Sequence, residues 1–359
     1  MREQVDQILA KTPGMRARQI AKELDVPRKE INSILHGNPE RYAQNDDYEW
    51  RLIPLEVVDL LLPSGWVTAD AFETSLRQAG PLLDGTIDSV NIVFRASSKP
   101  MIESTARILA LANQLSHQGK LVTLDFEAAE KTRTYLDRAG FFDHLDEAVQ
   151  VFPERPVHSA AGKHKGRSDT LVEFGGVDPE AVSQELINDL ARTFVLQSSN
   201  EYSEAAVTVF GELINNVVEH SQTDLPGFAG LQKYGGRRKH IQTVVSDSGV
   251  GIAQSLRPAL LPHYPRLHNQ FGGESLESDI GLVSEAMSKG EISRFGSARG
   301  LGFKSSSAQA MKFNACFTVR QETFCLKFIY EDGALIRIER QTGLSKLLGT
   351  HICFDFYID

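Results

Sequence analysis

The sequence predicts a multidomain α+β protein of 359 residues. Three observations lead to this prediction: an N-terminal segment with three short helical patterns and a hairpin, a middle segment in which strands and helices alternate, and a C-terminal segment with two long helices and several strands. At roughly 150 residues per domain, the length suits two to three domains. We place the domains at residues 1–53, 54–152 and 170–359, with a linker at 153–169.

The first segment, residues 1–53, holds three short helical patterns. The first pattern carries Val5, Ile8 and Leu9, and the others are "MRARQIAKELDV" and "PRKEINSILHG", where Pro27 suits a first helical turn. The stretch "RYAQNDDYEWRLI" follows, with a polar turn between two strand-like pieces. Two helices, a turn, a third helix and a hairpin are typical of a winged helix-turn-helix.

The exposed side of the third helix is a candidate nucleic-acid surface. Its polar side chains can contact phosphates or base edges, and a tryptophan lies in the hairpin that follows. These candidate nucleic-acid-binding residues are Arg28, Lys29, Asn32, Ser33, His36 and Trp50. The charges of this segment nearly cancel, so a winged helix that binds protein is the alternative.

Strands and helices alternate in the middle segment. After a helical lead-in come the strand "VNIVF", the helix "IESTARILALANQLSHQG", the strand "KLVTLDF", the helix "EAAEKTRTYLDRAG" and the strand "AVQVF". Alternation with helices that end at glycine indicates βαβ units on one sheet. Residues 153–169 are polar, basic and rich in small residues, which predicts a linker or an exposed loop.

The C-terminal segment is expected to pack helices on one face of a mostly antiparallel sheet. A strand "TLVEF" precedes two long helices that end near residue 221, and a hairpin turns at Gly235-Gly236. A long loop, a short helix after residue 300 and several strands complete the expected segment.

Two short motifs in this segment place polar groups where a nucleotide site needs them. In "GELINNVVEHS", Glu212 and Asn216 are four residues apart and share one helix face. A carboxylate there can orient a water, and an amide oxygen is a ligand for Mg²⁺. In "VVSDSGVGI", Asp247 ends a strand, where its carboxylate can accept a hydrogen bond from an adenine amino group. Gly249 and Gly251 allow the backbone to approach the base.

A third motif, "GSARGLGFKSSS", precedes a predicted helix whose free N–H groups can hold phosphate oxygens. Gly300 and Gly302 lie at the turn, and Arg299 and Lys304 add positive charge. A P-loop is absent, because neither "AAGKHKG" nor "GLGFKS" has the required spacing.

The order Glu-x-x-x-Asn, Asp-x-Gly-x-Gly and Arg-Gly-Leu-Gly resembles that of the GHKL (histidine-kinase-like) ATP-binding superfamily, over about residues 170–359. The resemblance implies a HATPase domain with the Bergerat fold, ATP and Mg²⁺ as cofactors, and a mobile lid at residues 253–298. It implies that Asn216 ligates the metal, that Asp247 binds adenine, and that Glu212 holds the catalytic position. The cofactor-binding residues that it implies are Asn216, Asp247, Gly249, Gly251, Arg299, Gly300, Leu301, Gly302 and Lys304.

Residues 88–152 resemble a STAS domain, the fold of anti-sigma-factor antagonists, in "VNIVFRASSKPMIESTARILALANQL", "QGKLVTLDF" and "YLDRAGFFDHL". That family places a phosphorylatable serine at a helix start, so Ser104 and Thr105 are candidate phosphoacceptors, although the usual Asp-Ser-Ser-Gly run is not kept. One alternative is that Glu103 and Ser104 cap the helix. Another is that the module is not phosphorylated and transmits the state of the ATP site to a protein partner.

The N-terminal segment resembles the Z-alpha type of domain that binds duplex nucleic acid, through "RQIAKELDVPRKEINSILHG" and "YEWRL". The sequence departs from that family in two places. His36 stands where the family has tyrosine, and Asp46, Asp47 and Glu49 make the wing more acidic.

The composition sets the expected compartment. No apolar run reaches the roughly 18 residues of a membrane span, and "MREQVDQILAK" is an amphipathic helix rather than a signal peptide. Cys316, Cys325 and Cys353 are expected to be buried free thiols in a reducing cytoplasm. His263 and His268 are expected in a loop and not in a metal site. A net charge of −9 disfavours non-specific binding of nucleic acid by the whole molecule.

We therefore expect a cytoplasmic, ATP-regulated signalling protein whose ATP site, with slow hydrolysis, controls the STAS-like module and a DNA-binding winged helix. The first alternative is a serine/threonine kinase of the anti-sigma type that acts on a STAS domain. The second is a GHKL ATPase that uses hydrolysis to clamp DNA or to form a homodimer, in stress response or antiviral defence.

Overall fold

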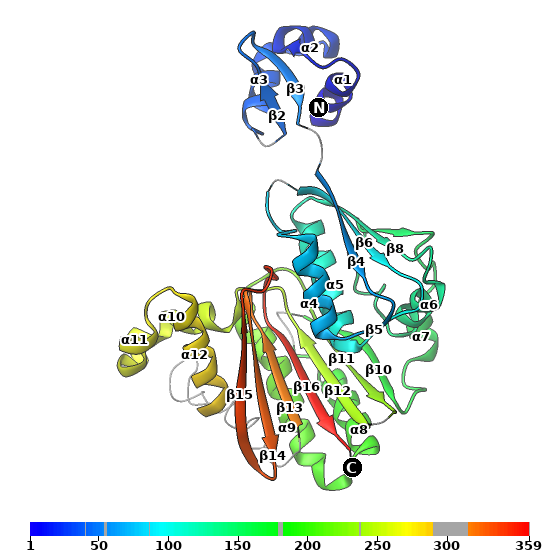
Figure 1. Cartoon of the computed structure of the whole chain (residues 1–359), viewed down its shortest axis with the longest axis vertical. Helices are drawn as coiled ribbons and strands as arrows, with labels where there is room; N and C mark the ends of the chain where they lie inside the picture. The colour runs from blue at the N-terminus through cyan, green and yellow to red at the C-terminus, as the bar shows by residue number, and fades with distance from the viewer. Residues whose placement is uncertain are drawn as a thin grey trace. The chain divides into compact units, whose positions relative to one another are not determined.

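The chain is a mixed α and β protein of more than one compact unit, as the sequence predicts (Figure 1). One unit comprises Met1–Val58 and Asp84–Ser89, and the other comprises Asp59–Leu83 and Val90–Asp359. The computed structural model describes residues 1–39, 41–53, 56–85, 87–178, 182–236, 238–289 and 315–358.

The described residues of the first unit form the expected helices and hairpin. The helices are α1 (Arg2–Lys11), α2 (Ala17–Leu24) and α3 (Arg28–His36), and the sheet β1-β3-β2 contains β1 (Met15–Arg16), β2 (Tyr42–Gln44) and β3 (Glu49–Leu52). Pro27 precedes the first turn of α3, as its restricted φ favours. The second helix starts later than predicted, because Met15 and Arg16 pair with β3. The core of this unit contains Val5, Leu9, Ile20, Ile31, Leu35, Tyr42 and Trp50.

The middle segment forms a four-stranded sheet in the order β4-β6-β8-β9 and a two-stranded parallel sheet of β5 and β7. Its elements are β4 (Glu56–Leu62), β5 (Gly65–Val67), α4 (Ala69–Ala79), β6 (Ile87–Phe94), β7 (Ser98–Pro100), α5 (Ile102–His117), β8 (Leu121–Asp125), α6 (Glu130–Arg138) and β9 (Gln150–Phe152). The predicted alternation is therefore present. The predicted helical lead-in is wrong in its first part, because "EVVDLLL" forms a strand whose last residues alternate between buried and exposed.

Most residues of 153–169 are exposed, as expected for an exposed loop, but some of their side chains anchor the segment on the middle segment. Ser159 caps the short helix α7 (Ala160–His164) and its hydroxyl donates to Asp143 Oδ2 at 2.7 Å. The Arg155 guanidinium donates to the carbonyl oxygens of Leu145 and Asp146. Such side-chain bonds to backbone carbonyls hold this segment in place.

The C-terminal segment forms an antiparallel sheet of seven described strands in the order β10-β11-β12-β16-β13-β14-β15. The strands are β10 (Leu171–Val177), β11 (Gly227–Tyr234), β12 (His240–Ser246), β13 (Ala315–Arg320), β14 (Phe324–Glu331), β15 (Ala334–Thr342) and β16 (His351–Tyr357). The helices α8 (Gln184–Gln197) and α9 (Ser203–His220) pack on this sheet through Phe194, Phe210 and Phe354. The hairpin turns between Tyr234 and His240, as predicted.

The expected loop at residues 253–298 is wrong for its described part, which is helical. The helices are α10 (Gly251–His263), α11 (Pro265–Phe271) and α12 (Leu276–Lys289). Ile252, Leu256 and Leu260 recur every four residues and are buried, so α10 has an apolar face that a loop would leave exposed. His263 and His268 accordingly lie in helices, and residues 290–298 fall outside the described residues.

Helix α5 joins the middle and C-terminal segments into one compact unit. It contacts β8 of the four-stranded sheet and β11, β12 and β16 of the seven-stranded sheet (Figure 1). Residues 104–115 are all buried, including Arg107, Asn113 and Gln114. A helix that is buried all round belongs to the interior of a larger domain.

Buried ionic contacts connect this helix to its neighbours. Glu73 of α4 lies 2.9 Å from Nη1 of Arg107 in α5 and 3.0 Å from Nε of Arg320 in β13. Arg107 also pairs with Glu103 one turn earlier. Charges this deeply buried require partners, and here each is paired with a charge from another element or another turn.

Candidate functional site

A pocket lies between α9, α10 and the strands β12 and β16. It is narrow, with a cavity volume of about 20 Å³, and it combines apolar walls with a few polar groups. The lining residues are Leu213, Asn216, Val217, Val245, Asp247, Gly251, Ile252, Ser255, Leu256, Thr350 and Ile352. The structure therefore brings together the first two motifs, "GELINNVVEHS" and "VVSDSGVGI".

Asp247 directly follows β12 and is 5% exposed. Its Oδ1 accepts hydrogen bonds from the backbone N–H groups of Gly249, at 2.8 Å, and Thr350, at 3.3 Å. Burial raises the pKa of its carboxyl to about 6, although these hydrogen bonds lower it. The result is an oriented acceptor at the edge of an apolar pocket.

Asn216 contributes an amide from α9. Its Nδ2 is buried and has no hydrogen-bond partner among the described residues. A buried amide without a partner costs about 1–3 kcal/mol, so this group is suited to a ligand that completes its hydrogen bonds.

Glycines hold the Asp247 turn against its neighbours. A Cβ atom on Gly249 would lie 1.9 Å from the carbonyl oxygen of Ser221, just beyond α9. On Gly349, where φ is +89°, it would lie 2.0 Å from the carbonyl oxygen of Asp247. Gly251 has a φ of +78° and lines the pocket. We predicted that Gly249 allows the base to approach, whereas the structure places its backbone against Ser221.

The remaining predicted nucleotide residues are placed as follows. Glu212 lies one turn before Asn216 in α9 and is half-buried, but it is not among the residues that line the pocket. Five predicted phosphate-site residues fall outside the described residues: Arg299, Gly300, Leu301, Gly302 and Lys304.

Several residues of the pocket could not be identified from sequence motifs. Thr350 and Ile352 enter it because β16 pairs with β12, with Ser246 opposite His351. The strand pattern of "GTHICFDFYID" was visible, but its pairing partner was not. Only that pairing places Thr350 beside Asp247.

The predicted phosphoacceptors lie in the interior. Ser104 is 0% exposed and Thr105 is 1% exposed. The Ser104 hydroxyl donates to the carbonyl oxygens of Val67 and Met101, and that of Thr105 donates to Met101. The folded chain therefore does not present either hydroxyl to a kinase, and this prediction is wrong for the described structure. The predicted cap is also wrong, since Met101 caps α5 without a side-chain bond.

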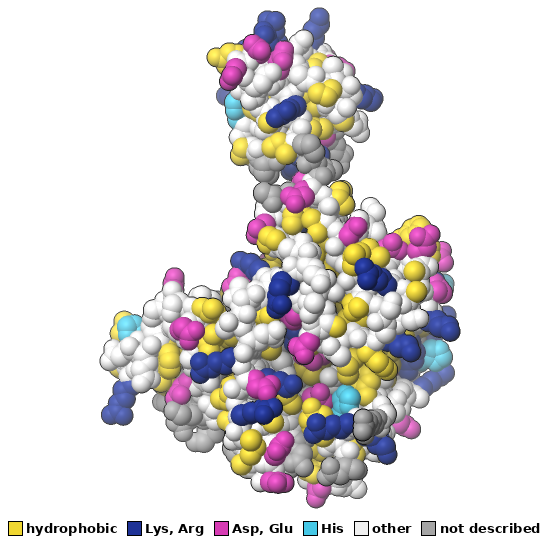
Figure 2. Space-filling model, in the orientation of Figure 1, with side chains coloured by type: hydrophobic (Ala, Val, Ile, Leu, Met, Phe, Trp, Pro, Cys, Tyr) yellow, Lys and Arg dark blue, Asp and Glu magenta, His cyan; other side chains and the backbone are white. Residues whose placement is uncertain are grey.

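The candidate nucleic-acid residues separate into two groups. Arg28, Lys29, Ser33 and His36 of α3 are exposed, and Asn32 is half-buried. Trp50 is only 4% exposed, belongs to the core of its unit and meets the His36 ring edge-on at 4.8 Å. A direct contact of Trp50 with nucleic acid is therefore excluded in this structure. On the face shown in Figure 2, Lys and Arg side chains are interspersed with Asp and Glu side chains.

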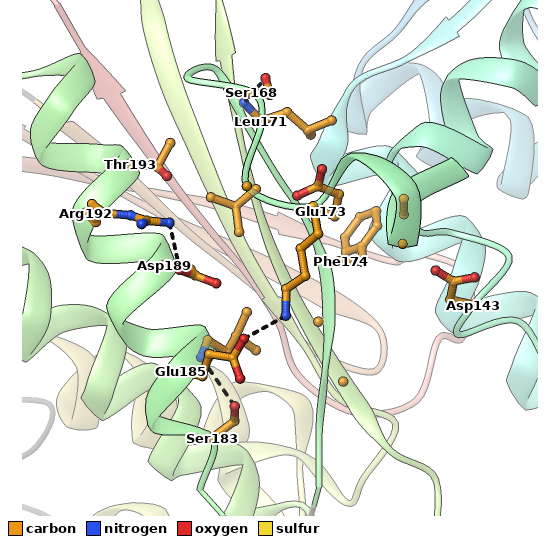
Figure 3. Close-up of a pocket in the computed structure, with 18 of the residues that line it drawn as sticks. Asp143, Ser168, Leu171, Glu173, Phe174, Ser183, Glu185, Asp189, Arg192 and Thr193 are labelled. Carbon is orange, nitrogen blue, oxygen red and sulfur yellow. Dashed lines mark hydrogen bonds and ion pairs between the residues drawn. The ribbon is translucent and has the colours of Figure 1, made fainter. Parts of the chain in front are cut away.

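Another cavity, of about 480 Å³, lies between β10, α8 and the segment around α7 (Figure 3). Several of its charged side chains are paired: Lys165 pairs with Glu185, and Figure 3 shows the pair of Arg192 with Asp189. Glu173 pairs with Arg138. Paired charges of both signs select no ligand, so we assign no function to this cavity.

Comparisons of the chain with protein-family models, curated proteins and solved structures find no significant match. Within the described part of the chain, every helix is too short or too polar to cross a bilayer. The described residues contain no cluster of three His, Cys, Asp or Glu side chains placed to hold a metal ion. Cys316, Cys325 and Cys353 are buried and free.

Proposed function

We propose that the C-terminal segment binds ATP together with Mg²⁺. The observation that carries the proposal is the meeting of Asp247 and Asn216 in one apolar-walled pocket. Val245, Leu256 and Ile352 are apolar walls that would have to move apart to receive a flat ring, because the cavity has a volume of only about 20 Å³, and the Asp247 carboxylate is an acceptor for an exocyclic amino group. An adenine base offers both the ring and the donor.

The metal assignment rests on Asn216. Its amide lines the pocket, where its oxygen would face the metal and its unpartnered nitrogen could donate to a phosphate oxygen. Bound Mg²⁺ would neutralise phosphate oxygens and is held by oxygen ligands such as an amide. Glu212 is the candidate to orient a water for slow hydrolysis.

The proposed role of the whole chain is regulation. Gln114 of α5 donates to Ser248 Oγ, at 3.0 Å, and to the carbonyl oxygen of Leu348, and its own Oε1 accepts from the N–H of Leu348. Ser248 follows Asp247, and Leu348 precedes the Gly349 turn. We propose that ATP binding at this turn acts through α5 on the STAS-like middle segment, and that a winged helix at the N-terminus binds nucleic acid.

Calorimetric titration tests the ATP site. We expect wild type to bind ATP with Mg²⁺, and Asp247→Asn to lose most of the heat, because the amide cannot offer the same charged acceptor. In Asn216→Ala the affinity for ATP should no longer depend on Mg²⁺. Asn215→Ala, which changes the neighbouring asparagine outside the pocket lining, should retain the dependence. Equal heats for wild type and Asp247→Asn would contradict the adenine assignment.

Nucleic-acid binding is a second candidate function, favoured by the exposed cations of α3. We expect Arg28→Gln or Lys29→Gln to weaken duplex binding and to reduce its salt dependence by about 0.9 in slope for each phosphate that the variant no longer neutralises. Gel-shift titrations at two salt concentrations measure both effects. A kinase acting in cis on Ser104 or Thr105 is disfavoured by the burial of those hydroxyls.

A further inference from the structure

An open groove of about 800 Å³ lies away from the Asp247 pocket. We call it the Trp66 groove. It is lined by Trp66, residues 96–100 after β6, residues 128–132 after β8, Tyr135, and residues 232–235 at the end of β11. Since the segments that follow β6 and β8 line one groove, both strands end at the same edge of their sheet. That edge is where open α/β sheets bind ligands.

The groove displays an aromatic ring that is held in place but remains accessible. Trp66 is 60% exposed, although its ring meets Tyr234 edge-on at 6.0 Å. Tyr234 is itself fixed, because its hydroxyl accepts a hydrogen bond from the N–H of Ile102 at 2.7 Å. Parallel pairing of β5 with β7 places Lys99 opposite Trp66, with Nζ 5.8 Å from the ring centroid.

The groove is also positively charged. Lys99, Lys131 and Lys233 line it, and they come from β7, α6 and β11 respectively. Among the described residues that line the groove, Glu130 is the one carboxylate, and it pairs with Arg133 at 2.8 Å. In a chain of net charge −9, this local excess of lysine favours an anionic ligand.

We propose that the Trp66 groove binds single-stranded nucleic acid. A base would stack on Trp66, and Lys99 and Lys131 would contact neighbouring phosphates, whereas Lys233 already donates to Oε1 of Gln197 at 2.7 Å. Base stacking on an aromatic side chain together with a cationic groove is the usual basis of single-strand binding. An acidic peptide would use the lysines but not the exposed ring. A nucleoside monophosphate would use the ring but has only one phosphate for the lysines of two elements, β7 and α6.

The test uses the full chain and a labelled 12-nucleotide oligothymidylate, with fluorescence anisotropy as the readout. We expect Trp66→Ala to weaken binding about tenfold or more, as removal of one stacking platform does. Lys99→Gln and Lys131→Gln should each reduce the slope of log affinity against log salt by about 0.7. Lys163→Gln, an exposed lysine outside the groove, is the matched control and should leave affinity unchanged.

Intrinsic fluorescence supplies a second readout. The chain has two tryptophans, and Trp50 is buried in the core of the other unit. Quenching of tryptophan fluorescence by the bound oligonucleotide should therefore disappear in Trp66→Ala. Circular dichroism melts check that each variant folds.

Several results would overturn the proposal. If oligonucleotide binding survives Trp66→Ala and Lys99→Gln but weakens in Lys29→Gln, the oligonucleotide binds to α3 instead. Equal affinity for thymidine monophosphate would identify a nucleotide site, and tighter binding of polyglutamate would identify a peptide site. Absence of strand binding by the folded wild type at millimolar concentration would leave the groove without this function.

Discussion

Asp247 is subject to opposite requirements from stability and from ligand binding. Its carboxyl has a pKa of about 6 in the fold and an ordinary value of 3.8 when solvated. Between these values the folded chain binds more protons than the unfolded chain, so the free energy of unfolding decreases as pH rises through this window. A residue kept only for stability would not be placed this way, whereas an acceptor for a ligand requires the charged form.

This residue predicts a pH dependence of ATP binding. We expect affinity to be constant above pH 7 and to fall about tenfold per pH unit well below the carboxyl pKa of about 6, because protonation removes the acceptor. Calorimetric titrations from pH 5 to pH 8 measure this directly. Asp247→Asn should show weak binding without this dependence, and at pH 8 its free energy of unfolding should exceed that of wild type by about 1–3 kcal/mol. A flat profile for wild type would contradict the assignment.

At the scale of elements, α5 is the helix on which two sheets depend. Both its apolar residues and its polar residues are buried, because different faces contact β8 and the seven-stranded sheet. The polar side chains are satisfied by specific partners, such as His144 O for Asn113 and Leu348 O for Gln114. Position and orientation of α5 are thus set by hydrogen bonds as well as by packing.

The ionic contacts of this helix predict a large effect of one substitution. Glu73→Ala would leave Arg320, whose side chain is 0% exposed, without its carboxylate partner. Removing one member of a buried pair costs about 3–5 kcal/mol. Urea unfolding measures the change, and Glu130→Ala, which removes an exposed pair with Arg133, should leave the midpoint nearly unchanged. A small effect of Glu73→Ala would show that water reaches Arg320.

At the scale of the molecule, the middle and C-terminal segments behave as one compact unit. We predicted from the sequence a domain boundary near residue 170, which implies that each segment folds alone. In the structure, α5 covers strands β11 and β12, so a C-terminal segment without α5 would expose apolar residues of that sheet face to water.

This arrangement predicts the behaviour of fragments. We expect residues 59–359 to unfold cooperatively, and residues 170–359 alone to be poorly folded, because the apolar face that α5 covers would then be hydrated. Thermal unfolding of the two fragments, followed by circular dichroism, compares them. A cooperative transition of the shorter fragment at the same temperature would show that α5 is dispensable for this sheet.

The periodicity of apolar residues made the order of elements predictable. Helices α8 and α9, the hairpin of β11 and β12, and the alternation from β6 to β9 follow the predicted segments. The motif order also indicated that Asn216 and Asp247 share a site, and one pocket contains both. The helices from α10 to α12 were missed because the family resemblance implied a mobile lid at residues 253–298, while buried contacts of residues such as Leu256 stabilise a helix.

The type and order of these elements, and the pocket residues Asn216 and Asp247, follow from the sequence alone. Apolar periodicity and short motifs carry this information because they depend on residues within one segment. The tertiary structure alone decided what covers each face. It buried Trp50, which its place in the hairpin had suggested was accessible, and Ser104 and Thr105, which the resemblance to a STAS domain had suggested were accessible. It also placed α5 between two sheets, since a helix pattern specifies an apolar face but not how many neighbours pack around it.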